Sequence, residues 1–161
     1  MKLYHGGVIE IETPKILDNQ RLVDFGKGFY TTTVLEQAQK WALIKKNREA
    51  AKEAFVSEFE INDAVFENKK YKILDFKVAD EQWLDFVIKN RKEYYLHGYD
   101  IVKGAVANDT LYTVIRLFET GILNKSETIS RLKVHKLFDQ ISFHNTEILK
   151  ELKLTKTHLI I

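Results

Sequence analysis

The sequence contains no cysteine and a single proline, Pro14, among its 161 residues. The absence of cysteine excludes disulfides, thiolate metal ligands and cysteine nucleophiles. No stretch rich in proline, glycine or serine divides the chain. We therefore expect one domain over residues 1–161, a length that can bury a hydrophobic core without covalent cross-links.

Long apolar runs are lacking as well. No segment approaches the roughly 20 apolar residues that a membrane-spanning helix needs, and no apolar stretch typical of a signal peptide follows Lys2. We expect a cytoplasmic protein with no membrane partner. The histidines at positions 97, 135, 144 and 158 do not have the HExxH spacing of a zinc site, so we expect no metal.

Charge of one sign is not in excess. The chain carries 25 basic and 23 acidic residues, for a formal net charge of +2, which provides no general attraction to nucleic acid. Basic clusters at 45–48 and 89–92 lie in segments with a helical pattern and are most often solvated faces. Hydrophobic residues make up 45% of the chain and aromatic residues 12%, which is enough for a folded core.

Strand and helix patterns alternate without regular βαβ order, which indicates the α+β class. Alternating hydrophobicity predicts a strand over 55–61, and Asp80 is a predicted helix N-cap, as is Thr32 or Thr33 for an earlier helix. Further strands are expected over 2–5, 8–11, 71–76, 99–107, 140–143 and 158–161. Helices are expected over 35–54, 81–94, 109–118 and 127–138, with a short one after Asn145 or Thr146.

Two short segments stand out chemically. Leu3-Tyr4-His5-Gly6 ends a predicted strand with a histidine beside glycine, where the ring is held on rigid backbone and stays accessible to a ligand. A histidine that only makes a hydrogen bond at a strand end is the more common case.

The second segment reads Asp-Phe-Gly-Lys-Gly-Phe-Tyr-Thr-Thr over residues 24–32. Gly26 and Gly28 would let the backbone approach a ligand closely, and Tyr30 can stack on a flat cationic ring, a contact worth about 0.5–2 kcal/mol. Neither the GxGxxG dinucleotide turn nor the GK[ST] phosphate loop is present. Without further context, a tyrosine in the core is the simpler interpretation of Tyr30.

Together the segments resemble the ADP-ribosyltransferases of the H-Y-E class, which includes diphtheria toxin and the poly(ADP-ribose) polymerases. The first segment resembles motif one, residues 25–30 resemble motif two, and Gln140 at the head of a late strand resembles motif three. Trp41 follows Tyr30 at nearly the spacing of the paired aromatic residues in the polymerases. Almost the whole chain is also similar to a bacterial family of uncharacterised ADP-ribosyltransferase-like proteins.

This resemblance implies a split β-sheet core with flanking helices and NAD as the substrate. It implies that His5 holds the nicotinamide ribose, that the Gly6 backbone pairs with the carboxamide, and that Tyr30 and Trp41 enclose the nicotinamide ring. It places three more residues at NAD: Gly28, Phe29 and Thr31. The guanidinium group of arginine matches the geometry of a phosphate, so Arg91 and Arg116 are candidate pyrophosphate ligands. A solvent-exposed position without a ligand is an equally simple interpretation of either arginine.

Gln140 stands where the class carries glutamate. Glutamine keeps a hydrogen-bond acceptor but has no charge and cannot act as a base. Three alternatives follow: Gln140 suffices for transfer, a neighbouring carboxylate such as Asp139 or Asp109 supplies the charge, or NAD-like ligands bind without turnover. For Asp109, a role as a helix N-cap is the more common case.

The expected activity is NAD-dependent mono-ADP-ribosyl transfer to a protein or nucleic-acid acceptor. The resemblance fits a toxin or effector, for which an inhibitory protein partner is a further expectation. Alternatives are an NAD glycohydrolase, a non-catalytic module that binds NAD-like ligands, and an α+β interaction protein without any cofactor.

Overall fold

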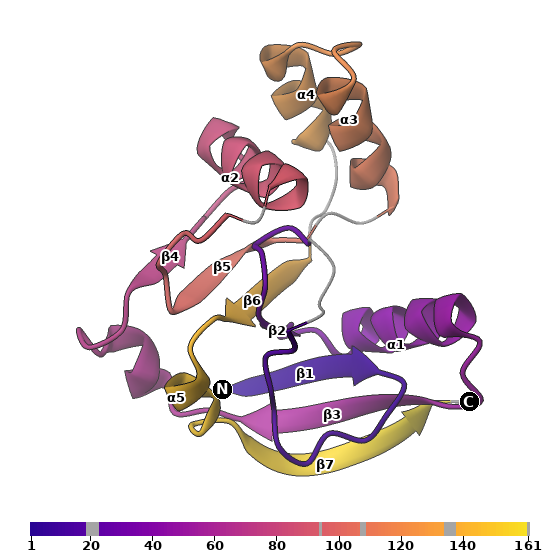
Figure 1. Ribbon diagram of the computed structural model, residues 1–161, viewed down its shortest axis with the longest axis vertical. Helices are drawn as coiled ribbons and strands as arrows, with labels where there is room; N and C mark the ends of the chain where they lie inside the picture. The colour runs from indigo at the N-terminus through magenta and orange to yellow at the C-terminus, as the bar shows by residue number, and fades with distance from the viewer. Residues whose placement is uncertain (19–22, 94, 107–108, 134–137, 161) are drawn as a thin grey trace.

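A computed structural model describes residues 1–18, 23–93, 95–106, 109–133 and 138–160, with only the backbone for 109–111 (Figure 1). These residues contain seven β-strands in two sheets and five α-helices. The α+β class predicted from the sequence is confirmed.

The first sheet is antiparallel, with the strand order β1-β3-β7. It consists of β1 (Lys2–Gly7), β3 (Ala54–Glu60) and β7 (Lys153–Ile160). Helix α1 (Leu35–Glu49) packs on one face of this sheet through Ala38 and Ala42, which are fully buried. A Cβ atom on Gly6 would lie 2.1 Å from the carbonyl oxygen of Ala38, so only glycine allows the helix to approach β1 this closely.

The second sheet has the order β2-β6-β5-β4, and β4 and β5 are its parallel pair. Its strands are β2 (Phe29–Thr31), β6 (Asp139–Phe143), β5 (Ile101–Ala105) and β4 (Ile73–Asp75).

Helices α2 (Glu81–Lys92), α3 (Asp109–Glu119) and α4 (Lys125–Leu132) gather beyond the second sheet, on the side away from the first (Figure 1). The fully buried Trp83 lies in the apolar cluster that joins these helices to β5. A short helix, α5 (Thr146–Leu149), connects β6 to β7, and a 3-10 helix spans Asp63–Glu67.

The two sheets meet where β1 passes β2. Tyr4 and Thr32 exchange two backbone hydrogen bonds, of 2.8 and 3.0 Å, as an isolated bridge. The bridge is isolated, so the described residues of β1 and β2 do not continue as a ladder, and His5 and Gly6 follow it along β1.

Several predicted boundaries need correction. The strand expected over 8–11 is absent, because these residues form bends and irregular backbone. Helix α1 ends at Glu49 rather than near 54, since Ala50 takes a left-handed conformation (φ 50°) and Ala54 begins β3. The Thr32 or Thr33 cap is wrong: Val34 is the N-cap residue and makes no side-chain cap bond.

Other sequence predictions are confirmed. Asp80 caps α2 by accepting a hydrogen bond from the Trp83 amide at 3.0 Å, and Asn145 caps α5. The final strand is longer than predicted and pairs along the whole of β3. Residues 134–137, which fall in the predicted helix over 127–138, lie outside the described residues.

Candidate functional site

An open cleft of about 1180 Å³ lies where the two sheets separate. Its walls are the end of β1 with the loop after it, β2 with the loop before it, and one side of α1. Seven residues singled out from the sequence line it: His5, Gly6, Gly28, Phe29, Tyr30, Trp41 and Gln140. The fold therefore brings together side chains that are up to 135 positions apart in the chain.

His5 is held in one orientation. Its ring stacks on Phe29 with centroids 4.5 Å apart, and its Nδ1 lies 2.7 Å from the carbonyl oxygen of Tyr30. A carbonyl only accepts hydrogen bonds, so Nδ1 carries the proton and Nε2 is an acceptor. Burial lowers the pKa of His5 to about 4, which keeps the ring neutral at pH 7. The available Nε2 suits a ligand that donates a hydroxyl proton.

The peptide groups of Gly6 face the gap between the sheets. Those of Tyr4 point toward β2, and because peptide direction alternates along a strand, those of Gly6 point the same way. Continued pairing would place Gly6 opposite Tyr30, but the Tyr30 carbonyl bonds to the His5 ring instead. Gly6 can therefore offer one N–H donor and one C=O acceptor to a ligand.

The hydroxyl group of Tyr30 makes its hydrogen bonds to the loop before β2. The hydroxyl donates to the carbonyl oxygen of Gly26 at 2.6 Å and accepts from the amide of Phe25 at 3.0 Å. Burial, together with the nearby charge of Asp24, raises the Tyr30 pKa well above its usual value of 10. Tyr30 thus contributes a ring to the cleft wall and is unsuited to proton transfer.

Three side chains hold consecutive carbonyl groups of the loop before β2. The carbonyl of Phe25 binds Nε2 of His97 at 3.0 Å, that of Gly26 binds the Tyr30 hydroxyl, and that of Lys27 binds Nδ1 of His144 at 2.6 Å. The loop is therefore fixed in shape from within the protein.

The two glycines of this loop are explained by internal packing. Gly26 has a φ of +79°, and a Cβ atom there would lie 2.7 Å from the side-chain oxygen of Asn90. A Cβ on Gly28 would lie 2.8 Å from the His144 ring. Internal packing thus accounts for both glycines without a ligand, and the close approach of a ligand to Gly28, which lines the cleft, stays a prediction.

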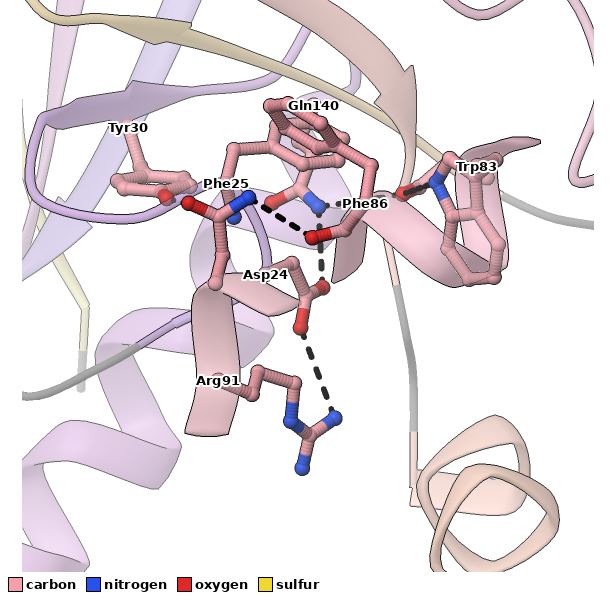
Figure 2. Close-up of polar contacts among 9 residues, drawn as sticks. Asp24, Phe25, Tyr30, Trp83, Phe86, Arg91 and Gln140 are labelled. Carbon is pink, nitrogen blue, oxygen red and sulfur yellow. Dashed lines mark hydrogen bonds and ion pairs between the residues drawn. The ribbon is translucent and has the colours of Figure 1, made fainter. Parts of the chain in front are cut away.

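Gln140 lies on the cleft wall with only 3% of its surface exposed. Figure 2 shows its amide nitrogen donating to Oδ2 of Asp24 at 3.0 Å and to the carbonyl oxygen of Ala105 at 3.1 Å. These two bonds use both amide hydrogens, so Oε1 remains as an acceptor for the cleft.

Arg91 lies behind Asp24 and is not on the cleft wall. Its guanidinium nitrogen is 3.7 Å from Oδ1 of Asp24 (Figure 2). Its Cζ is 3.8 Å from the centre of the Tyr112 ring. The Arg91 and Asp24 side chains are 9% and 11% exposed. In this position Arg91 partners a buried carboxylate, so contact with a pyrophosphate would require it to move.

The remaining residues predicted for the site do not line the cleft in the part of the chain that the structure describes. Thr31 is fully buried, and its hydroxyl donates to the carbonyl of Ile141. Asp139 accepts hydrogen bonds from the Thr33 amide and hydroxyl in the turn before α1. Arg116 is exposed on α3. The side chain of Asp109 lies outside the described residues.

Asp24, His97 and His144 were not recognised from the sequence as parts of this site. Asp24 only began a motif, and the two histidines only failed to match a metal spacing. Each lies far along the chain from the group that it contacts, so no local pattern marks it. In the part of the chain that the structure describes, no group of three or more metal-ligating side chains is found.

No helix among the described residues is long and apolar enough to cross a membrane. Comparison with curated proteins and with solved structures finds no significant match. Against protein families, residues 1–154 match the family described as "Protein of unknown function (DUF3990)". Because this match covers nearly the whole chain, the protein belongs to the DUF3990 family.

Proposed function

We propose that this chain is an NAD-dependent mono-ADP-ribosyltransferase and that its two sheets form the split core of that superfamily. The observation that carries the proposal is the convergence of His5, Tyr30, Trp41 and Gln140 on one cleft. These residues come from three strands and a helix, and they stand at the positions that resemble the three motifs of the H-Y-E class, with Gln140 in place of glutamate.

The cleft suits a dinucleotide in size. Pockets for drug-sized ligands have volumes of about 300–1,000 Å³, and this one, at about 1180 Å³, is larger. In the proposed complex Tyr30 and Trp41 enclose the nicotinamide ring, and the peptide groups of Gly6 pair with its carboxamide. A ribose hydroxyl donates to Nε2 of His5, which is available because Nδ1 is engaged by Tyr30.

The reaction breaks the bond between the nicotinamide nitrogen and C1′ of the ribose. Nicotinamide leaves as a neutral molecule with the bonding electron pair, and positive charge develops on the ribose. A nucleophilic group of the acceptor then bonds to C1′ and loses its proton. The chain's contribution is to hold the sugar and to place hydrogen-bond acceptors such as Oε1 of Gln140 against the developing charge.

Labelled NAD tests the proposal. Purified protein incubated with NAD and a cell lysate is expected to release nicotinamide and to label a macromolecule. His5→Ala should abolish both signals, whereas His158→Ala, on β7 and outside the cleft, should leave them unchanged. Absence of both signals from the unmodified protein would contradict the proposed activity.

Gln140 favours a second candidate, in which the cleft binds NAD without reaction. Its side chain is neutral and its amide nitrogen is fully engaged. Calorimetry that shows NAD binding without nicotinamide release would support this candidate. Nicotinamide release without any labelled macromolecule would instead identify an NAD glycohydrolase.

A further inference from the structure

We infer that Asp24 carries the negative charge that glutamate would bring to position 140, and that Asp24 and Gln140 act as a single carboxylate–amide unit facing a cationic ligand. The inference rests on the proposed function and deepens it, because it assigns the charge of the site to a residue outside the three motifs. The unit is defined by the 3.0 Å hydrogen bond from Nε2 of Gln140 to Oδ2 of Asp24.

The first argument concerns the orientation of Gln140. Its amide could in principle turn either way, but its two neighbours, the Asp24 carboxylate and the Ala105 carbonyl, can only accept hydrogen bonds. Only the amide nitrogen can face both of them. Asp24 therefore acts as a positioning residue that directs Oε1 of Gln140 toward the cleft.

The second argument explains why an amide occupies position 140. A glutamate there would place an oxygen about 3 Å from Oδ2 of Asp24 in a position that is almost completely buried. Two carboxylates so close do not both ionise near neutral pH, because the repulsion raises one pKa strongly and the pair shares one proton. One negative charge is the number that this pocket accommodates, and in this chain it lies on Asp24.

The third argument concerns where the charge acts. Asp24 lines the cleft, whereas Arg91 approaches its other carboxylate oxygen from the side away from Gln140 (Figure 2). The ion pair is thus directed with its negative end toward the cleft. Tyr30, which forms the adjacent wall, already experiences this charge, because Asp24 contributes to its raised pKa. A cationic ring against Tyr30 would experience the same field, which is weakly screened in a buried setting.

The experiment compares two small probes of the same shape. 1-Methylnicotinamide carries a permanent positive charge, and 3-methylbenzamide is its neutral counterpart, with the carboxamide and methyl groups at the same ring positions. Calorimetry gives the ratio of their dissociation constants. We expect the unmodified protein to favour the cation by about tenfold, the effect of one charge at a partly screened distance.

Three variants then remove, relocate or add a carboxylate at positions 24 and 140. Asp24→Asn should bring the ratio close to one. The double variant Asp24→Asn with Gln140→Glu exchanges the carboxylate and the amide, keeps their hydrogen bond, and should restore the preference. Gln140→Glu alone should retain a preference that grows as the pH rises and the shared proton dissociates. Asp75→Asn, which removes a carboxylate on β4 outside the cleft, should change nothing.

The outcomes are distinguishable. If Asp24→Asn weakens both probes equally and the double variant does not recover the preference, Asp24 is only a structural partner of Arg91 and the inference is wrong. If Asp24→Asn fails to fold, the double variant decides by its ratio alone. A native protein that binds both probes equally overturns the inference but not the proposed function. One that binds neither overturns both.

Discussion

The two walls of the cleft differ in how their shapes are maintained. The loop wall, residues 24–30 with Gln140, is mostly buried apart from Lys27 and is bonded at three consecutive carbonyl groups. The helix wall consists of the buried Gly6 and of α1 side chains that are partly or fully exposed, namely Trp41, Ile44, Lys45 and Arg48. The loop wall is therefore set before a ligand arrives, while the helix wall offers side chains that are free to adjust.

Acid should weaken the loop wall most of all, because His5 and His144 bond to its carbonyl groups at Tyr30 and Lys27. Burial lowers the pKa of His5 and of His144 to about 4, below the ordinary value of 6.5. The folded protein thus binds fewer protons than the unfolded chain between these values. Their contribution to stability is complete above pH 6.5 and is lost as the pH falls toward 4, on the order of 2 kcal/mol for each histidine by pH 5.

Proton NMR of the imidazole rings measures these titrations directly, and urea unfolding at pH 7 and pH 5 measures their effect on stability. Midpoints near 6.5 for both rings would show that burial does not exclude the charged form. A low midpoint for His144 alone would indicate that burial excludes the charged form of His144 but not that of His5.

Gly6→Ala tests the base of the helix wall. The new Cβ atom would lie 2.1 Å from the Ala38 carbonyl oxygen and 2.8 Å from the Ala42 amide nitrogen, so β1 and α1 must separate. We expect a loss of about 3 kcal/mol in the free energy of unfolding, measured with urea. The control is Gly98→Ala, where φ is positive but no atom lies within 4 Å. An equal loss in both variants would contradict close helix–strand packing as the cause.

His144→Ala releases one of the three bonds that fix the loop wall. It leaves the Lys27 carbonyl without its partner, and we expect a loss of about 2 kcal/mol in stability, with faster amide exchange in residues 25–28. His158→Ala, which removes a contact with Glu58 in the first sheet, should leave amide exchange in residues 25–28 unchanged. If loop exchange is unaffected in His144→Ala, the loop wall is not held by the contact seen at Lys27.

Trp41→Ala tests whether the helix wall contributes to ligand binding rather than to stability. Because Trp41 is only half-buried and lines the cleft, its removal should change stability by no more than about 0.5 kcal/mol. NAD binding, followed by calorimetry, should weaken by about tenfold, because one face of the ring contact is lost. Leu43→Ala, exposed on α1 outside the cleft, should bind as before; equal losses in both variants would argue against ring stacking.

Local chemistry accounts for the parts of this protein that could be predicted from its sequence. Alternation over 55–61 indicated β3, Asp80 and Asn145 were recognised as caps, and the order of the three motifs identified residues that do meet in one cleft. Each of these signals lies within a few residues of the feature it predicts. Helix α1 was extended too far because a left-handed turn at Ala50 carries no glycine signal.

The hydrogen-bond partners of the site residues became clear only from the tertiary structure. Asp24 and Gln140 are 116 positions apart, and His144 is 117 positions from the carbonyl that it holds. Such pairs form because β6 lies between β2 and β5 in the second sheet, a pairing that depends on the whole core. The sequence by itself determined the element types and the motif residues, since periodicity and capping are local. The partner of each polar group depended on long-range packing, which no local pattern encodes.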